Sequence, residues 1–281
     1  MRSLYWFRND LRLNDNLSLN LAVKNSDAIL FVHINDIPKE INYPWRLLEI
    51  GQHRKLFLSQ GLSELKKNLS KYGHQLNLYT DNSVRILSNL VKKYQIDTIY
   101  CELINAPDEI KQIKLLEDMK INVVSFFHSS LFMQNQLPFS VAELPNIFSD
   151  FRKAIESGEV KPNEPVSISK NIFNIKPITD NQSVMLDTYP LDYSKSSFPI
   201  TQKNFIGGEE SGIVYLKKYF QSNKAESYKH TRNELTGINF STKFSPWLSL
   251  GYISARQVFS YLDEYENNIK KNESTYWIFF E

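Results

Sequence analysis

The first 130 residues alternate short segments rich in β-branched and aromatic residues with segments of helical periodicity. The strand-like runs are 3–7, 28–34, 75–79, 96–101 and 122–127, and the helix-like segments are 17–24, 46–71, 84–94 and 108–119. Parallel strands need crossover connections, so this alternation predicts an α/β fold. We expect a doubly wound, Rossmann-like parallel sheet of about five strands over residues 1–130, with ligands bound beyond the carboxyl ends of the strands.

The amino-acid composition of the chain changes after this region. Seven prolines lie between residues 131 and 200, among many Asn, Ser and Asp residues. This composition predicts a long interdomain linker over 131–200 that is laid across a surface, with one short helix near 147–156. Segments 209–221, 246–250, 254–265 and 272–281 have helical character, which predicts an all-α region over 201–281.

Length and composition favour a soluble, cytoplasmic protein. The 281 residues are 42% hydrophobic and can furnish a substantial core, while a net charge of +2 argues neither for nor against nucleic acid. A single cysteine, Cys101, excludes an intramolecular disulfide and is expected to be a small buried hydrophobe. The N-terminus does not have the character of a signal peptide, and no apolar run approaches the roughly 20 residues of a membrane helix, so we expect no membrane partner.

Several common site motifs do not occur in the sequence. No GxGxxG and no GxxxxGK[ST] follows a predicted strand, which argues against a dinucleotide or P-loop site in the first domain. The five histidines form no HxH or HxxxH pair and lie beside no cysteine, so we expect no metal site. The GxSxG motif that marks the nucleophile of many hydrolases does not occur either.

Residues 241–245, with the sequence STKFS, bring three hydroxyls and one ammonium group close together. Pro246 then opens a helical stretch, with Ser245 as the expected N-cap. A helix start with hydroxyls and a lysine suits a phosphate or diphosphate. The alternative is a capped helix without a ligand.

A second polar cluster, formed by Arg8, Asp10, Arg12 and Asp15, follows the first predicted strand. Alternating opposite charges in such a loop usually form a local network of ion pairs and hydrogen bonds. We therefore expect these four residues to have a structural role.

Motifs spread over nearly the whole chain carry a family resemblance. They are LYWFRNDLRLNDN at the N-terminus, NFIGGEESGIVYLKKYF, YKHTRN, STKFSPWLSLGYISARQVF and the terminal TYWIFFE. Together they resemble the photolyase/cryptochrome family, and most closely its DASH cryptochrome branch. The resemblance implies an antenna-binding α/β domain, a linker and an all-α FAD-binding domain that is incomplete, because the chain stops at Glu281.

The resemblance also implies roles for residues of the last 60 positions. Tyr228 would contact the adenine dinucleotide moiety of FAD, and Arg232 would either aid phosphate binding or be a surface arginine. The loop residues that would hold the FAD diphosphate are Ser241, Thr242, Lys243, Phe244 and Ser245. Glu281 would touch the pyrimidine dimer as the catalytic acid, and Trp277 would stack against the base, unless it is plain core.

One residue of the first domain also receives a role from the resemblance. The antenna of the family is a deazaflavin or a folate such as 5,10-methenyltetrahydrofolate, and in DASH members an acidic residue after the fourth strand contacts the folate. Glu102 lies near the matching place. The alternative is that Glu102 is an exposed, solvated surface charge.

The implied activity is that of a blue-light, FAD-dependent deoxyribodipyrimidine photolyase. Such an enzyme is a lyase that splits cyclobutane pyrimidine dimers in single-stranded DNA by photoinduced electron transfer. Two alternatives remain: a cryptochrome photoreceptor that binds flavin or nucleic acid without repair, and an inactive truncated remnant. We expect the 281-residue chain alone to bind FAD weakly and repair little, unless a second chain supplies the missing half.

Overall fold

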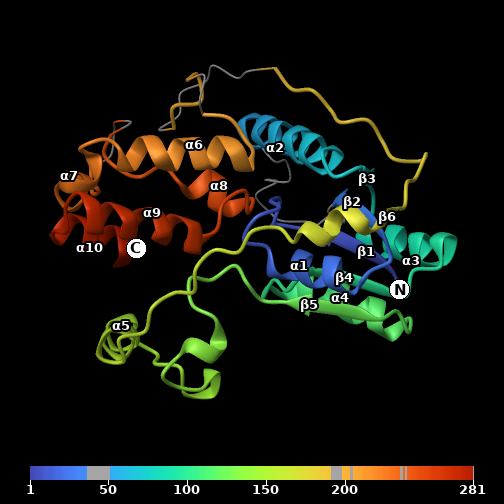
Figure 1. The fold of residues 1–281 in the computed structure, drawn as a ribbon, viewed down its shortest axis with the longest axis horizontal. Coiled ribbons are helices and arrows are strands. Elements are labelled where there is room, and N and C mark those ends of the chain that lie inside the picture. Colours follow the sequence, from blue (N-terminus) through green and yellow to red (C-terminus); the bar gives the residue numbers. More distant parts are fainter. Residues whose placement is uncertain (37–50, 191–197, 203–204, 235–236, 238, 281) are drawn as a thin grey trace, which may run out of the picture.

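A parallel sheet with five main strands occupies one half of the molecule (Figure 1). The computed structural model describes residues 1–36, 51–190, 198–202, 205–234, 237 and 239–280. The strands are β1 (Arg2–Phe7), β2 (Ala28–Asn35), β3 (Leu76–Thr80), β4 (Thr98–Glu102) and β5 (Val123–Phe126). Their order is β3-β2-β1-β4-β5 and all neighbours are parallel, so the predicted doubly wound sheet is confirmed.

Four helices cover the two faces of this sheet. They are α1 (Leu17–Asn25), α2 (Gln52–Ser70), α3 (Ser83–Tyr94) and α4 (Pro107–Asp118). Alternate side chains of β1 enter different cores: Tyr5 packs in the core that includes α1 and α2, and Leu4 in the core that includes α3 and α4. Because both faces are covered, the central strands are apolar almost throughout, as the sequence pattern indicated.

The linker differs from its prediction, because part of it returns to the sheet. It contains three 3₁₀ turns, a helix and a short strand: η1 (Gln134–Gln136), η2 (Val141–Glu143), α5 (Phe148–Ser157), η3 (Lys170–Asn174) and β6 (Lys176–Pro177). β6 pairs with β2 as a sixth strand, and Ile172 and Ile175 are buried in the main core. Residues 134–157, which include α5, instead form an arm that projects from the molecule (Figure 1).

The helical part lies beside the sheet and is built from five helices in the described residues. They are α6 (Glu209–Phe220), α7 (Lys224–Thr231), α8 (Ser245–Ser249), α9 (Ala255–Asn268) and α10 (Glu273–Phe280). The sequence did not predict α7, which is short and has no clear apolar stripe. The predicted helix 46–71 is observed from Gln52, and its first residues lie outside the described part.

The α/β and helical parts share one apolar core. The ring of Phe57 in α2 lies 5.3 Å from that of Trp247 in α8, centroid to centroid. Tyr252 packs against Gly61, and its hydroxyl donates a hydrogen bond to the carbonyl of Phe57 at 3.1 Å. The two parts are therefore joined by buried side chains and not only by the linker.

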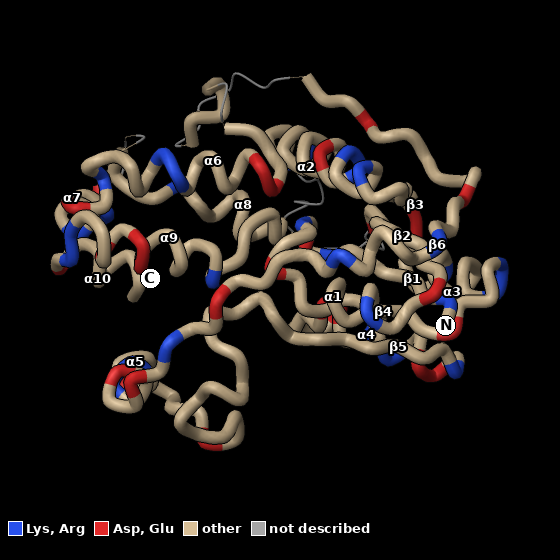
Figure 2. The backbone as a smooth tube through the Cα atoms, viewed as in Figure 1, with Lys and Arg blue, Asp and Glu red and all other residues tan. Residues whose placement is uncertain are grey.

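Cys101 is fully buried and unpaired, and burial raises the pKa of its thiol to about 12, as expected for a small hydrophobe. None of the helices in the described ranges has the length and apolarity to cross a membrane. Basic and acidic residues are interspersed over both parts of the molecule (Figure 2).

We expect Gly251→Ala to destabilise the protein more than Gly73→Ala. Both glycines have positive φ, 65° and 79° respectively. A Cβ atom on Gly251 would lie 1.8 Å from the carbonyl oxygen of Asn9, whereas nothing lies within 4 Å of such an atom on Gly73. Backbone strain alone should cost about 1 kcal/mol, and the clash should raise the loss at Gly251 to at least about 2 kcal/mol. Urea unfolding measures the loss in free energy of unfolding for each variant. Equal losses would contradict a tight contact between Gly251 and the first loop.

Candidate functional site

The charged loop after β1 forms the local network that the sequence predicted. The hydroxyl of Tyr5 donates to Asp10 Oδ2 at 2.5 Å, and the backbone N–H of Arg8 donates to Asp10 Oδ1 at 2.8 Å. Arg12 donates to the carbonyl of Asp15 at 2.9 Å. All four charged residues of the loop are buried.

This network also reaches the helical part, which the sequence did not indicate. Arg12 donates to the carbonyl of Gly251 at 3.0 Å, and Arg256 of α9 forms an ion pair with Asp15 at 2.9 Å. Glu209 of α6 accepts hydrogen bonds from the backbone N–H groups of Leu13 at 2.7 Å and Asn14 at 2.9 Å. The loop therefore holds the two halves together through buried, charge-assisted contacts.

Arg256 in addition fixes the start of the linker. Its guanidinium donates to the carbonyls of Ser130 at 3.0 Å and His128 at 3.1 Å. A planar guanidinium with five donors can bind several acceptors at once, which a lysine cannot match. One side chain thus ties α9 to the first loop and to the segment that leads into the arm.

Glu102, at the end of β4, is buried within the same region. Its exposed fraction is 1%, so the alternative of a solvated surface charge is wrong. Burial raises the pKa of Glu102 to about 8, and the negative charge of Asp10 adds to the rise, while Arg12 and Arg8 oppose it. Its proposed contact with an antenna stays a prediction.

We expect Glu102→Gln to flatten the dependence of stability on pH. Unfolded Glu102 ionises near its ordinary pKa of 4.5, whereas the folded side chain stays protonated up to about pH 8. The contribution of Glu102 to the free energy of unfolding should therefore be fully present below pH 4.5. It should be lost as the pH rises through 8, and the loss should be at most about 5 kcal/mol. The glutamine variant cannot ionise and should be the more stable protein at pH 9.

Urea unfolding at several pH values between 5 and 9 measures this difference. Glu117→Gln, on the exposed surface of α4, is the matched control and should follow the unchanged protein. Parallel curves for Glu102→Gln and the unchanged protein would contradict a protonated Glu102.

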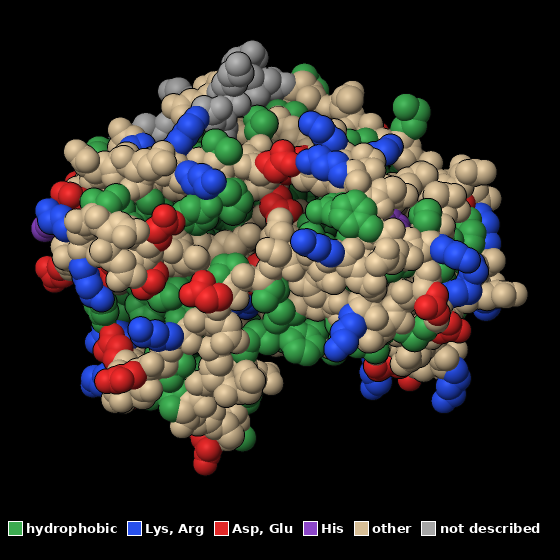
Figure 3. Space-filling view, in the orientation of Figure 1, with side chains coloured by type: hydrophobic (Ala, Val, Ile, Leu, Met, Phe, Trp, Pro, Cys, Tyr) green, Lys and Arg blue, Asp and Glu red, His purple; other side chains and the backbone are tan. Residues whose placement is uncertain are grey.

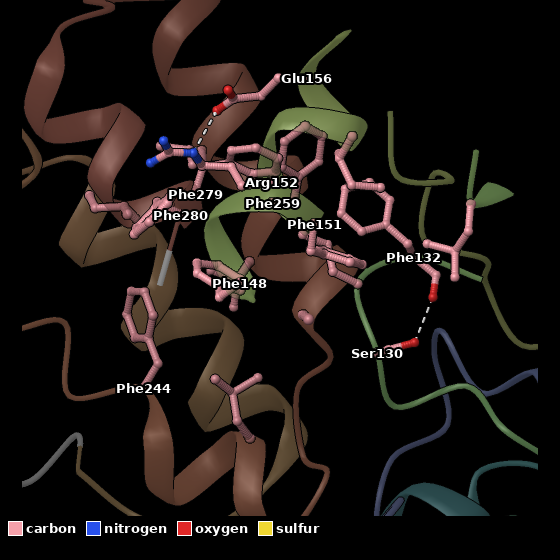
Figure 4. A pocket seen from close by; sticks show the side chains of 18 of the residues that line it. Ser130, Phe132, Phe148, Phe151, Arg152, Glu156, Phe244, Phe259, Phe279 and Phe280 are labelled. Carbon is pink, nitrogen blue, oxygen red and sulfur yellow. Dashed lines mark hydrogen bonds and ion pairs between the residues drawn. The ribbon is translucent and has the colours of Figure 1, made fainter. Parts of the chain in front are cut away.

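A cavity of about 720 Å³ lies where the arm meets the helical part. Hydrophobic side chains gather on this face of the molecule (Figure 3). The lining of the cavity includes Phe148, Phe151 and Arg152 of α5, together with Phe259 of α9 and Phe279 and Phe280 of α10 (Figure 4). Its volume is within the range of small-molecule and cofactor sites.

Four residues singled out from the sequence meet at this cavity. Tyr228 of α7 lines it together with Thr242, Phe244 and Ser245 of the hydroxyl-rich loop. In the described part of the chain, the backbone N–H groups of residues 242–245 donate to no protein acceptor. These groups are therefore available to a ligand.

The backbone of this loop is shaped as an anion-binding turn. Lys243 has a left-handed φ of 58°, and Phe244 is right-handed helical with φ −76° and ψ −20°. Alternation of this kind turns successive N–H groups toward one concave point, which suits a phosphate. The prediction of Ser245 as an N-cap is wrong: Ser245 is the first residue of α8, because Phe244 before it is already helical and is the cap.

Of the other predicted site residues, those that the structure describes lie outside the lining of the cavity. Ser241 neighbours the loop, and the ammonium of Lys243 lies 5.4 Å from the ring centre of Phe198. The structure brings Arg232 and Trp277 together, with the guanidinium 4.2 Å from the indole centre. Glu281 is not among the described residues.

The arm contributes cavity residues that the sequence indicated only as part of a linker. Phe148, Phe151, Arg152 and Ile155 of α5 all line the cavity. The available signal was the spacing of these side chains on one helix, FSDFRKAI, within an otherwise irregular segment. Only the folded chain could show what this face covers.

Comparison with known proteins identifies the family. A family model described as DNA photolyase matches residues 3–167. The chain belongs to the DNA photolyase family. The resemblance noted in the sequence is therefore confirmed.

Similar members of the photolyase family are cryptochromes of the DASH type. The cryptochrome DASH of Idiomarina loihiensis is 34% identical over 99% of this chain and 60% of its own length, and that of Danio rerio is 34% identical over 98% and 54%. The crystal structure of a Synechocystis cryptochrome is 30% identical, with a TM-score of 0.84 over 100% of this chain and 59% of that one. The chain thus spans little more than half the length of these relatives.

Proposed function

We propose that the protein binds FAD in the cavity between the arm and the helical part. The observation that carries the proposal is the convergence of Tyr228 and loop 242–245 on one cavity. The unused N–H groups and hydroxyls of the loop would bind the diphosphate, and Tyr228 would lie along the dinucleotide. The apolar rings that line the rest of the cavity would exclude water from the flavin.

We further propose that the protein repairs cyclobutane pyrimidine dimers in single-stranded DNA under blue light. Bound FAD would supply the light-driven electron transfer, and the protein would position flavin and lesion. Membership of the photolyase family and similarity to DASH cryptochromes support this activity. Trp277 and Glu281 are the proposed lesion contacts.

One observation favours the alternative of a photoreceptor that does not repair DNA. The ring of Trp277 is covered by the guanidinium of Arg232 at 4.2 Å and meets the ring of Phe280 at 4.8 Å. One face of this indole is therefore covered, and a base could stack on that face only after Arg232 moved.

A light-dependent repair assay separates the two functions. We expect purified protein with FAD to split few dimers in single-stranded DNA under blue light, and still fewer in duplex DNA because unpairing costs a few kcal/mol. Flavin binding without any dimer loss in illuminated single strands would overturn the repair proposal and favour the photoreceptor.

Replacing the loop hydroxyls tests the FAD site itself. Thr242→Ala combined with Ser245→Ala removes two donors to a charged phosphate and should raise the Kd for FAD by about 10- to 100-fold. Ser249→Ala, also on α8 but exposed and outside the cavity lining, is the matched control. Flavin fluorescence titration gives both Kd values, and an unchanged Kd for the double variant would place FAD elsewhere.

A second hollow of about 740 Å³ is the proposed place for an antenna such as a folate. It lies between α2 and the start of α6, beneath the extended segment 186–189, and Gln60 and Ser63 are among its polar lining residues. This position between the two parts of the molecule suits a pigment that passes energy to the flavin. Glu102 does not line it.

A further inference from the structure

Arg152 is the only Lys or Arg among the described residues that line the cavity. It belongs to α5 of the arm, and neither the anion-binding loop nor Tyr228 contributes a full positive charge. Lys243 of the loop does not line the cavity, and its ammonium lies over the ring of Phe198. A charged diphosphate in an apolar cavity needs a cationic partner, because an unpaired charge away from water is costly.

The guanidinium of Arg152 has an unused donor. Its Nε atom is buried without a hydrogen-bond partner. The nearest carboxylate oxygen, Oε1 of Glu156, lies 3.7 Å from Nε, which is too far for a hydrogen bond (Figure 4). The same oxygen instead accepts from the hydroxyl of Tyr276 at 2.5 Å. A buried donor without an acceptor indicates that another group completes the site.

The orientation of the Arg152 guanidinium is fixed by an aromatic ring. Its guanidinium lies 4.8 Å from the ring centre of Phe280, over the ring face. Stacking uses the flat face of the guanidinium, whereas its five N–H groups point outward in the plane. The Nε atom is buried, but the side chain as a whole is 32% exposed, so a ligand can reach another part of the guanidinium.

We propose that Arg152 is the counter-cation of a phosphate-bearing ligand in this cavity and donates a hydrogen bond to a phosphate oxygen. The proposal rests on the proposed function, since it takes FAD as the ligand of the cavity. It assigns a binding role to the linker, which joins the two domains and supplies one charged residue to the flavin site. Glu156, 3.7 Å away, competes with the ligand for this guanidinium.

Binding of FAD and of riboflavin, which has no phosphate, tests this role. Arg152→Met should raise the Kd for FAD at least about tenfold and change that for riboflavin less than about twofold, because only the phosphate contact is lost. Arg152→Lys keeps the charge and should recover most of the FAD affinity. Glu156→Gln removes the competing carboxylate and should tighten FAD binding about two- to fivefold.

Arg85→Met is the control. It removes a surface arginine of α3 that is paired with Asp81, and it should change neither Kd. An Arg152→Met variant that weakens FAD and riboflavin equally, or neither, would overturn the proposal and leave the flavin site standing. An unchanged protein that binds no FAD would instead overturn the proposed function, and the role of Arg152 with it.

Discussion

The buried ion pair between Arg256 and Asp15 is the interaction on which the arrangement of the two halves depends. Both side chains are at most 2% exposed, and the same guanidinium also binds the carbonyls of His128 and Ser130. Loss of one partner from such a pair leaves a buried charge and typically costs 3–5 kcal/mol. One arginine therefore fixes the positions of the first loop, the start of the linker and α9 relative to one another.

The cavity depends on this junction, because several separate segments of the chain form its lining. Its walls come from the arm, from loop 242–245 and from α7, α9 and α10. The arm itself buries little, since Ile155 is the one buried residue of α5. Its position depends on contacts such as the edge-to-face pair of Phe148 and Phe280 at 5.1 Å. Binding of the proposed flavin should therefore be coupled to the junction of the two halves.

The strands and most helices could be predicted from the sequence because their signals are local. Apolar runs with turn residues between them marked all five main strands, and capping residues such as Asn16 and Asn82 begin α1 and α3 where the pattern does. β6 and α7 were missed for a physical reason. A strand of two residues, Lys176–Pro177, and an eight-residue helix of mainly polar residues form through their neighbours and not through their own pattern.

The sequence by itself determined the α/β fold, the family and the hydroxyl-rich loop, since each is encoded in contiguous residues. Only the tertiary structure decided that Glu102 is buried, that Arg12 and Arg256 join the halves, and that Arg152 lines the cavity. Burial and charge pairing depend on side chains far apart in the chain. They come together only when the linker folds back and the helical part packs against the sheet.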